Sequence, residues 1–330
     1  MWVALAMIVL LVVFSIIGAF LGAACAKAVF NSLPLDVYWF FFIMVLAGGM
    51  MMFRRLVRVP AILLIHAGCV LILGGAMWGS PAGHEVQSHL FGIEKIPDGR
   101  MVIHEGEQEK RVFVSEQEVR ELPFYVRLKS FRMEYYEPSR LIVEGRDGTL
   151  RQMPVKTGSS LELGASKVRV TILKQYENFK IRIDGDKREA YDDTGAGLNA
   201  ALEVRLDYPD GRSVTRYVFE KFPGHGHANN EYVFAYRRQI RDYISELEIV
   251  QNGEVSAAKA IEVNHPLGFG GYDFYQDSYG SEQGIYTVLR VTSNSGVRAV
   301  YAGYAMLCAG LFWHLWLKDV TAGVLKFRKA

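Results

Sequence analysis

Four long apolar segments constrain the fold of this 330-residue chain more than any other feature. A helix needs about 20 apolar residues to cross the hydrocarbon core of a bilayer, and each segment approaches or exceeds that length. Three segments precede residue 81, and the fourth lies near the C-terminus. The predicted spans are Trp2–Ala26, Val37–Phe53, Pro60–Ser80 and Ala299–Leu317.

Basic residues beside these segments predict the orientation of the chain. One group lies between the second and third spans, and another follows the fourth. If all four segments cross, both groups lie on one side, which the positive-inside rule makes cytoplasmic. Both termini are then cytoplasmic, and residues 81–297 are periplasmic or otherwise extracytoplasmic. The basic residues are Arg54, Arg55 and Arg58, and Lys318, Lys326, Arg328 and Lys329.

A signal peptide is the alternative interpretation of the first segment. Gly22-Ala23-Ala24-Cys25 resembles a loose lipoprotein cleavage site. Against cleavage, the segment lacks a basic n-region, and its apolar stretch is long for a signal peptide. We therefore expect an uncleaved helix and a multi-pass protein of the inner (plasma) membrane.

Charge and cysteine content narrow the function of the polar stretch. It is mildly acidic and carries no basic stripe, which argues against nucleic-acid binding. It contains no cysteine, since Cys25, Cys69 and Cys308 all lie in apolar segments. The chain has neither C-x-x-C nor C-x-x-C-H, so a thioredoxin-like reductant and a c-type cytochrome are not expected.

The polar stretch is predicted to be mostly β, with antiparallel sheets in a sandwich or open barrel of one or two lobes. Turn signals such as Asp184-Gly185, Asp210-Gly211 and Asn252-Gly253 separate runs rich in β-branched and aromatic residues. Residues Asp184–Asn199 and Lys221–Glu231 are expected to be loops. The predicted strands are Arg111–Ser115, Phe124–Phe131, Leu141–Val143, Lys167–Ile172, Phe179–Ile183, Ala201–Leu206, Ser213–Phe219, Tyr232–Tyr236, Ile244–Gln251 and Ile285–Val291.

The expected layout therefore has four parts. Residues 1–80 hold three transmembrane helices, at about 2–26, 37–53 and 60–80. Residues 81–297 form the extracytoplasmic β-rich domain. Residues 298–317 form the fourth transmembrane helix, and residues 318–330 form a basic cytoplasmic tail.

The histidines are the only plausible candidates for catalysis or for binding a cofactor or metal. The chain has no Ser/His/Asp nucleophile motif, phosphate-binding glycine loop or H-E-x-x-H motif. His66 lies inside the third span, about 12 Å along the helix from Arg58. An imidazole in the membrane interior needs a partner, so it is a candidate functional residue. An ordinary interhelical hydrogen bond is the alternative.

His314 is the second candidate, about 6 Å from the charged end of the fourth span. It is either an interfacial residue of the aromatic belt with Trp313 and Trp316 or a second haem ligand. The remaining histidines are weaker candidates. His225 and His227 form an H-x-H pair that could bind a metal, and His265 is expected in a turn. His84, His89 and His104 follow the third span, where we expect solvated loop positions; the alternative is that they meet a ligand at the outer membrane face.

Aromatic residues and glycines lie close together in Gly268–Tyr279, just before the last span, with five aromatic residues and three glycines. An aromatic-rich strand that packs on the core is the simplest interpretation. Together with Glu262–Leu267, however, this run resembles the pattern N-H-P-L … G-Y-x-F-Y-Q-x-S-Y of the ResB family, the system II cytochrome c biogenesis proteins. The segments Leu122–Leu128 and Leu35–Trp39 are also similar to that family, as is the four-span layout.

The resemblance implies a function. ResB-like proteins form a membrane complex with a ResC-like or CcsA-like multi-span partner, whose Trp-rich motif is absent here. The complex is thought to pass haem b outward for thioether attachment to C-x-x-C-H of apocytochrome c, with a thiol-reducing protein as a further partner. The resemblance makes His66 the haem axial ligand candidate and His314 a weaker one. It gives a structural or interaction role to Gly271, Tyr272, Phe274, Tyr275, Gln276 and Tyr279.

Two other functions remain open at this stage. The chain could be a scaffold that stabilises the ResC-like partner and docks apocytochrome without binding haem. It could also be an unrelated membrane-anchored binding domain. No catalytic motif is present in this chain alone, so any synthase activity would belong to the complex.

Overall fold

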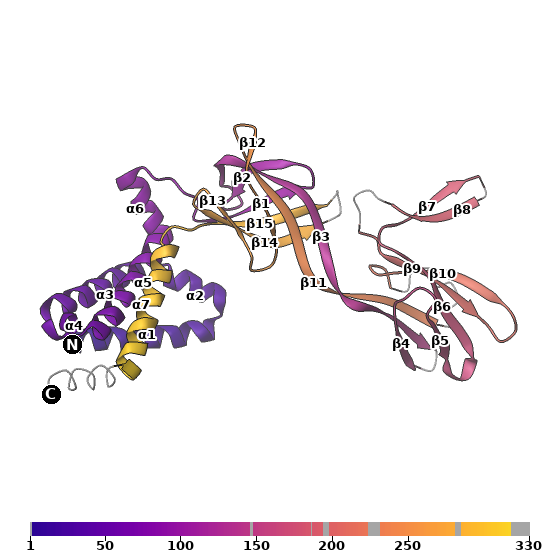
Figure 1. Ribbon diagram of the computed structural model, residues 1–330, viewed down its shortest axis with the longest axis horizontal. Helices are drawn as coiled ribbons and strands as arrows, with labels where there is room; N and C mark the ends of the chain where they lie inside the picture. The colour runs from indigo at the N-terminus through magenta and orange to yellow at the C-terminus, as the bar shows by residue number, and fades with distance from the viewer. Residues whose placement is uncertain are drawn as a thin grey trace, which may run out of the picture. The chain divides into compact units, whose positions relative to one another are not determined.

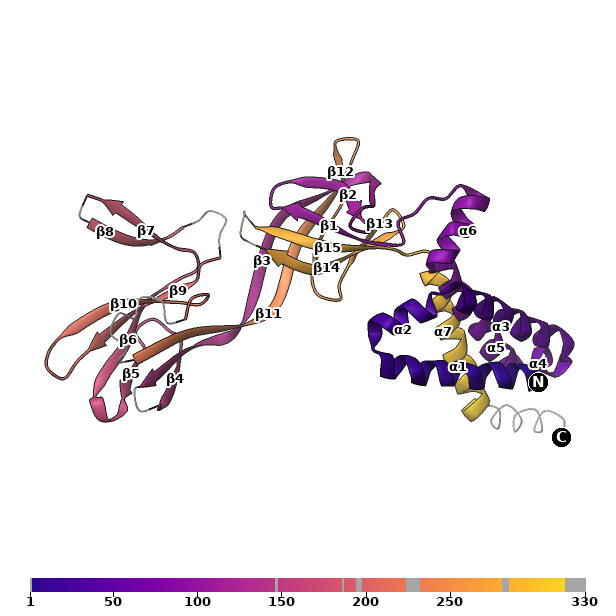
Figure 2. The same cartoon turned by 180° about the vertical axis from the view of Figure 1, so that it is seen from behind.

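A computed structural model describes residues 2–145, 148–185, 187–193, 198–223, 232–280 and 285–317. The chain divides into two compact units, each treated separately below (Figures 1 and 2). The helical unit comprises Met1–Gly99, Gly270–Asp273 and Val291–Ala330. The β unit comprises Arg100–Phe269 and Phe274–Arg290.

The helical unit contains the four predicted apolar helices. Helices α1, α3 and α5, and α7 with the π-helical turn that follows it, are each long and apolar enough to cross a membrane. Few of their side chains are buried inside the protein, as expected of helices whose surfaces face lipid. The protein is therefore a multi-pass membrane protein. The helices are α1 (Trp2–Leu21), α2 (Ala23–Phe30), α3 (Leu33–Met52), α4 (Arg54–Arg58), α5 (Pro60–Gly79), α6 (Pro81–Phe91) and α7 (Val297–Phe312), with the π turn at Trp313–Leu317.

The first predicted span was too long. Helix α1 ends at Leu21, because Gly22 adopts a positive φ of 84° and reverses the chain. Helix α2 then folds back along α1, and a side chain at Gly18 would lie 3.3 Å from the Phe30 ring. The second span begins earlier than predicted, at Leu33, because proline is well tolerated in the first turn of a helix.

Helices α5 and α7 pack side by side through a seam of small residues. A Cβ at Gly68 would lie 2.7 Å from the carbonyl oxygen of Gly303, and one at Gly75 would lie 2.8 Å from that of Gly296. Seven residues beyond Gly303 on α7, Gly310 lies against the carbonyl oxygen of Ala61 on α5. The pairs recur every seven residues in opposite directions, so the helices are antiparallel and their backbones touch.

The β unit is built on antiparallel pairs, which confirms the predicted fold class. Nine strands form one sheet, in the order β12-β11-β3-β2-β1-β15-β14-β13 with β4 paired to β3. Four form a second sheet, β10-β9-β6-β5, and β7 pairs with β8. The strands are β1 (Asp98–His104), β2 (Gln108–Phe113), β3 (Val119–Gly145), β4 (Leu150–Pro154), β5 (Ser160–Leu163), β6 (Val168–Tyr176), β7 (Phe179–Asp184), β8 (Lys187–Asp192), β9 (Ala201–Asp207), β10 (Ser213–Phe219), β11 (Tyr232–Gln251), β12 (Glu254–Ile261), β13 (Leu267–Phe269), β14 (Tyr272–Gly280) and β15 (Tyr286–Ser293).

Two long strands connect the parts of the β unit. β3 has 27 residues and β11 has 20, and they pair antiparallel over most of their length (Figure 1). Each merges two segments that the sequence predicts as separate strands. The ladder shifts register between Arg237 and Gln239 and again between Ile240 and Asp242. Bulges of this kind bend a strand without ending it, which is why one strand serves both segments.

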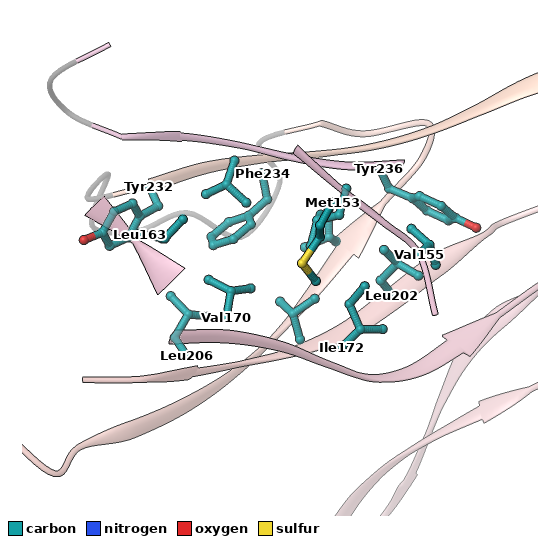
Figure 3. Close-up of a cluster of buried hydrophobic side chains, with 14 of the residues drawn as sticks. Met153, Val155, Leu163, Val170, Ile172, Leu202, Leu206, Tyr232, Phe234 and Tyr236 are labelled. Carbon is teal, nitrogen blue, oxygen red and sulfur yellow. The ribbon is translucent and has the colours of Figure 1, made fainter. Parts of the chain in front are cut away.

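Beyond the bulges, the ends of β3 and β11 form a two-layer sandwich with the four-stranded sheet. Side chains from β3, β4 and β11 meet side chains from β5, β6, β9 and β10 (Figure 3). Phe234 and Tyr236 point into this core from β11 and are almost fully buried. Their alternation with exposed residues is the period-2 pattern from which the strand was predicted.

The turn predictions are mostly confirmed. Asn252 and Gly253 have φ of 52° and 84°, as a two-residue type I′ hairpin between β11 and β12 requires. Asp184–Asn199, predicted as a loop, instead begins with a hairpin in which six residues of β7 pair with β8. That loop prediction was wrong because charged residues in β8 hid its strand pattern. The second predicted loop lies largely outside the described residues.

Two buried tyrosines predict how the β unit responds to alkaline pH. Burial raises the pKa of Tyr135 and of Tyr236 to about 12, although Arg238 acts in the opposite direction. In the unfolded chain these tyrosines therefore ionise first, near pH 10. Their contribution to the free energy of unfolding is fully present below pH 10 and is lost as the pH rises toward 12. Tyr236→Phe should remove about 1 kcal/mol of the loss between pH 9 and pH 11. Unfolding followed by the β-sheet circular dichroism signal at both pH values checks this, and an equal loss in the variant would contradict it.

Candidate functional site

His66 lies in the middle of α5 and is half-buried. Its Nδ1 lies 2.9 Å from the carbonyl oxygen of Ile62, one turn earlier. A carbonyl oxygen only accepts, so Nδ1 carries the proton and Nε2 keeps its lone pair. This is the tautomer in which a neutral imidazole binds a metal through Nε2.

His66 faces away from α7. At about 100° per residue, it lies about 160° around α5 from Gly68, which touches α7. A partner group for Nε2 therefore comes from a direction other than α7.

His314 lies in the π turn that follows α7, half-buried between the exposed Trp313 and Trp316. The register of the glycine seam places His66 opposite Ala305. His314 lies nine residues further along the α7 segment, a separation of about 14 Å along the axis. The two histidines are therefore not brought together as a pair of axial ligands.

The other described histidines differ in burial. The expected solvated loop positions were wrong for the three histidines after the third span: His84 and His89 lie in α6, and His104 lies at the end of β1. His89 is exposed, His84 is buried, and His104 lies against the ring of Tyr286 at 5.4 Å. His265 donates its backbone N–H to Glu262, which confirms the predicted turn. His225 and His227 lie outside the described residues. Among the residues that the structure describes, no group of three or more His, Cys, Asp or Glu could hold a metal.

The aromatic run Gly268–Tyr279 forms β13, a glycine turn and β14. Tyr272 and Phe274 point inward and are buried, whereas Tyr275 is 36% exposed on the opposite face. Phe274 packs edge-on against Phe124 of β3 at 6.2 Å. This confirms an aromatic strand that packs on the core.

Gln276 joins three strands through a buried polar network. Its amide donates to Thr287 Oγ1 of β15 at 2.8 Å, and Ser245 Oγ of β11 donates to its Oε1 at 2.6 Å. Tyr279 stacks on Phe131 at 5.2 Å. β11 and β14 are far apart in the strand order, so these contacts show that the sheet curls until its distant strands face each other.

Gly271 and Tyr272 form a junction inside the helical unit. The N–H of Ile96, which follows α6, donates to the Tyr272 hydroxyl at 3.3 Å. The N–H of Asn294, which precedes α7, donates to the Gly271 carbonyl at 3.1 Å. Gly271 has a φ of 84°, and the ammonium group of Lys95 occupies the space where a Cβ would lie. The turn therefore holds together the two segments that lead to and from the helices.

The fold defines a class: a multi-pass membrane protein with one large antiparallel β region between its third and fourth long apolar helices. The profile of the ResB-like family matches residues 53–163 and 220–285, which together make up more than half of the chain. The chain therefore belongs to the ResB-like family, as its motifs predict. The matched residues include α5 with His66 and all of β14.

The chain is also similar to Protein NrfI of Wolinella succinogenes. The two are 30% identical over 123 residues, which is 34% of this chain. The match spans only 12% of the length of NrfI. Together with the family match, this similarity supports a role in cytochrome c biogenesis.

Proposed function

We propose that this chain is the ResB-like component of a system II cytochrome c synthase complex. In this role it helps to move haem across the membrane and presents it with apocytochrome c for thioether attachment at C-x-x-C-H. Membership of the ResB-like family supports the proposal most directly. The partners proposed with it are a ResC-like or CcsA-like protein, apocytochrome c and a thiol-reducing protein.

Haem is the cargo of such a complex, and His66 fits it chemically. Haem iron accepts neutral imidazole nitrogen as an axial ligand, and the apolar ring of haem is compatible with the membrane interior. The bond from Nδ1 to Ile62 supports a free Nε2 directed away from α7. The second ligand then belongs to the partner protein rather than to His314.

The proposed location is the cytoplasmic membrane, with both termini inside and the β unit outside. Arg58 and the basic residues after α7 favour this orientation under the positive-inside rule. Lys318, Lys326, Arg328 and Lys329 lie outside the described residues. In this arrangement the β unit positions apocytochrome or closes the outer haem pocket of the partner.

A scaffold without haem contact is the second candidate function. The observation that favours it is the aromatic run, because Tyr272, Phe274 and Gln276 serve packing and hydrogen bonding rather than a ligand. Under this alternative the β unit stabilises the ResC-like partner, and His66 forms only a structural bond.

Haem content of the purified complex distinguishes the two functions. The chain is co-expressed with a ResC-like protein in cells that lack their own cytochrome c maturation system. His66→Ala should remove most of the b-type haem and the low-spin axial signal, and exogenous imidazole should restore the signal to His66→Gly. His314→Ala should retain both. If His66→Ala leaves haem content and cytochrome maturation unchanged, the scaffold function is favoured.

A further inference from the structure

Helix α6 packs across the end of α5, the third apolar span. Near its start, a Cβ at Gly83 would lie 2.6 Å from the carbonyl oxygen of Trp78. In its middle, the Gln87 amide donates to the same oxygen at 2.6 Å, and at its end the Phe91 ring lies 5.8 Å from the Trp78 ring. Gly83 and Phe91 are about 12 Å apart along the helix. Because both still contact the last turn of α5, α6 turns back across that end and does not continue the axis of α5.

The face of α6 that contacts the rest of the helical unit is polar. His84 and Gln87 lie one turn apart on this face and are buried. His84 Nδ1 donates to the Ser80 carbonyl at 2.8 Å, and the Gln87 side-chain oxygen accepts from Ser295 at 3.3 Å. These hydrogen bonds hold α6 to the end of α5 and to the segment before α7.

A second face of α6 is apolar and exposed. Leu90 is 72% exposed and Val86, one turn earlier, is 44% exposed. Val86 lies about 160° around the helix from His84. Ile93, just beyond the helix, is also exposed. A surface helix in water has the reverse arrangement, with its apolar stripe against the protein and its polar side chains outside.

A third face of α6 is polar and exposed. Glu85 and His89 lie on the side of Val86 away from Gln87. The helix therefore presents buried polar groups to the protein, apolar groups in a second direction and ionisable groups in a third. A helix that lies in the membrane interface beside a transmembrane bundle needs these three faces, toward protein, lipid and water.

We propose that α6 is an interfacial helix that inserts Val86 and Leu90 into the lipid at the end of α5. Continuity with the surface of a membrane span favours lipid as the occupant. Phe91 and Trp78 are both exposed and in contact, so the apolar face of α6 meets the side of α5 at a tryptophan, a residue enriched at membrane interfaces. The inference rests on the membrane spans and is independent of haem handling.

Insertion of α6 has a consequence for the junction that follows it. The N–H of Ile96 donates to the Tyr272 hydroxyl at 3.3 Å, five residues after α6 ends. A helix anchored in lipid on one face and bonded to α5 on another fixes the depth at which this junction lies. The partner of the α6 surface is thus a lipid leaflet, and its role is to hold the junction at the membrane surface.

Fluorescence quenching in phospholipid vesicles tests the proposal. An environment-sensitive fluorophore is attached to Leu90→Cys in the full-length chain, with Cys25, Cys69 and Cys308 replaced by alanine. Brominated acyl chains should quench it at least about threefold more strongly than at Glu85→Cys, the matched exposed position on the polar face. Aqueous iodide should quench the two positions in the reverse order. Val86→Cys, on the apolar face, should behave as Leu90→Cys, so a label that disturbs folding at one position does not decide the result.

Two outcomes overturn the proposal. If iodide quenches the labels on both faces equally and brominated lipid quenches neither, the apolar face of α6 lies in water. If a co-reconstituted ResC-like protein shields Leu90→Cys from both quenchers, that face is a protein contact and lipid is not its occupant. Retained quenching by brominated lipid in the presence of the ResC-like protein supports the proposal. Failure of the proposed haem function is read separately, from the haem content of His66→Ala.

Discussion

Gly68→Leu is expected to separate α5 from α7 and to lower the unfolding temperature of the helical unit by about 10 °C. A Cβ at Gly68 would lie 2.7 Å from the Gly303 carbonyl oxygen and 2.9 Å from the Leu307 backbone nitrogen. Neither is the end of a flexible side chain, so the helix itself has to move. Close backbone approach through small residues is the main source of attraction between helices in lipid, where no hydrophobic effect pulls them together.

Gly74→Leu provides a matched control on the same helix. The described residues place no atom within 4 Å of a Cβ at Gly74, so leucine there should extend into lipid. Thermal unfolding in detergent, followed by the thiol reactivity of the half-buried Cys69 next to the seam, compares the two variants. Equal stability of Gly68→Leu and Gly74→Leu would show that the seam is not a close contact.

Hydropathy predicted the long helices well because membrane insertion depends on composition over some 20 residues. The ends of the helices depend on single residues, and a hydropathy average over many residues does not detect the effect of one. Gly22 ends α1 within an apolar run, and only its positive φ shows why. Helix α6 was not predicted, although Ser80 and Pro81 are suitable start signals and Gly92 a suitable stop signal.

The strand pattern predicted most strands but not their continuity. Residues between the two predicted halves of β11 are polar or exposed, so period-2 alternation weakens there although pairing with β3 continues. The curl of the sheet depends on contacts such as Ser245 with Gln276, which are distant in sequence. Local patterns carry no information about such contacts.

The sequence was enough to choose the candidate histidine, but it did not predict which groups surround it. His66 stands out because an imidazole inside an apolar span is rare. The buried His84 does not stand out in the same way, because the three histidines after the third span look alike in sequence. Its spacing from Gln87, three residues later on one helix face, is the signal that could have separated it from His89, but that signal requires α6 to be recognised first.

Arg238→Ala should destabilise the β unit by about 3–5 kcal/mol, the usual cost of removing one partner from a buried ion pair. The Arg238 side chain is 4% exposed. Its Nη1 lies 2.6 Å from Glu177 Oε2, its Nη2 lies 2.7 Å from Glu220 Oε2, and its guanidinium carbon lies 4.0 Å from the Tyr135 ring centroid. Arg238 thus ties β11 to the end of β10 and the end of β6, next to the bulges. Hydrogen exchange of β6 and β10 in the full-length protein measures the effect locally.

The two carboxylates should differ in importance because they differ in burial. The Glu177 side chain is 64% exposed, so Glu177→Gln should cost less than about 1 kcal/mol. Glu220 is 23% exposed and accepts from both Nε and Nη2, so Glu220→Gln should cost more. Arg237→Ala, at the exposed neighbouring position, should change stability by about 0.5 kcal/mol or less. If Arg237→Ala and Arg238→Ala had the same effect, the guanidinium would not be buried between these elements, and the bulges alone would set the bend of β11.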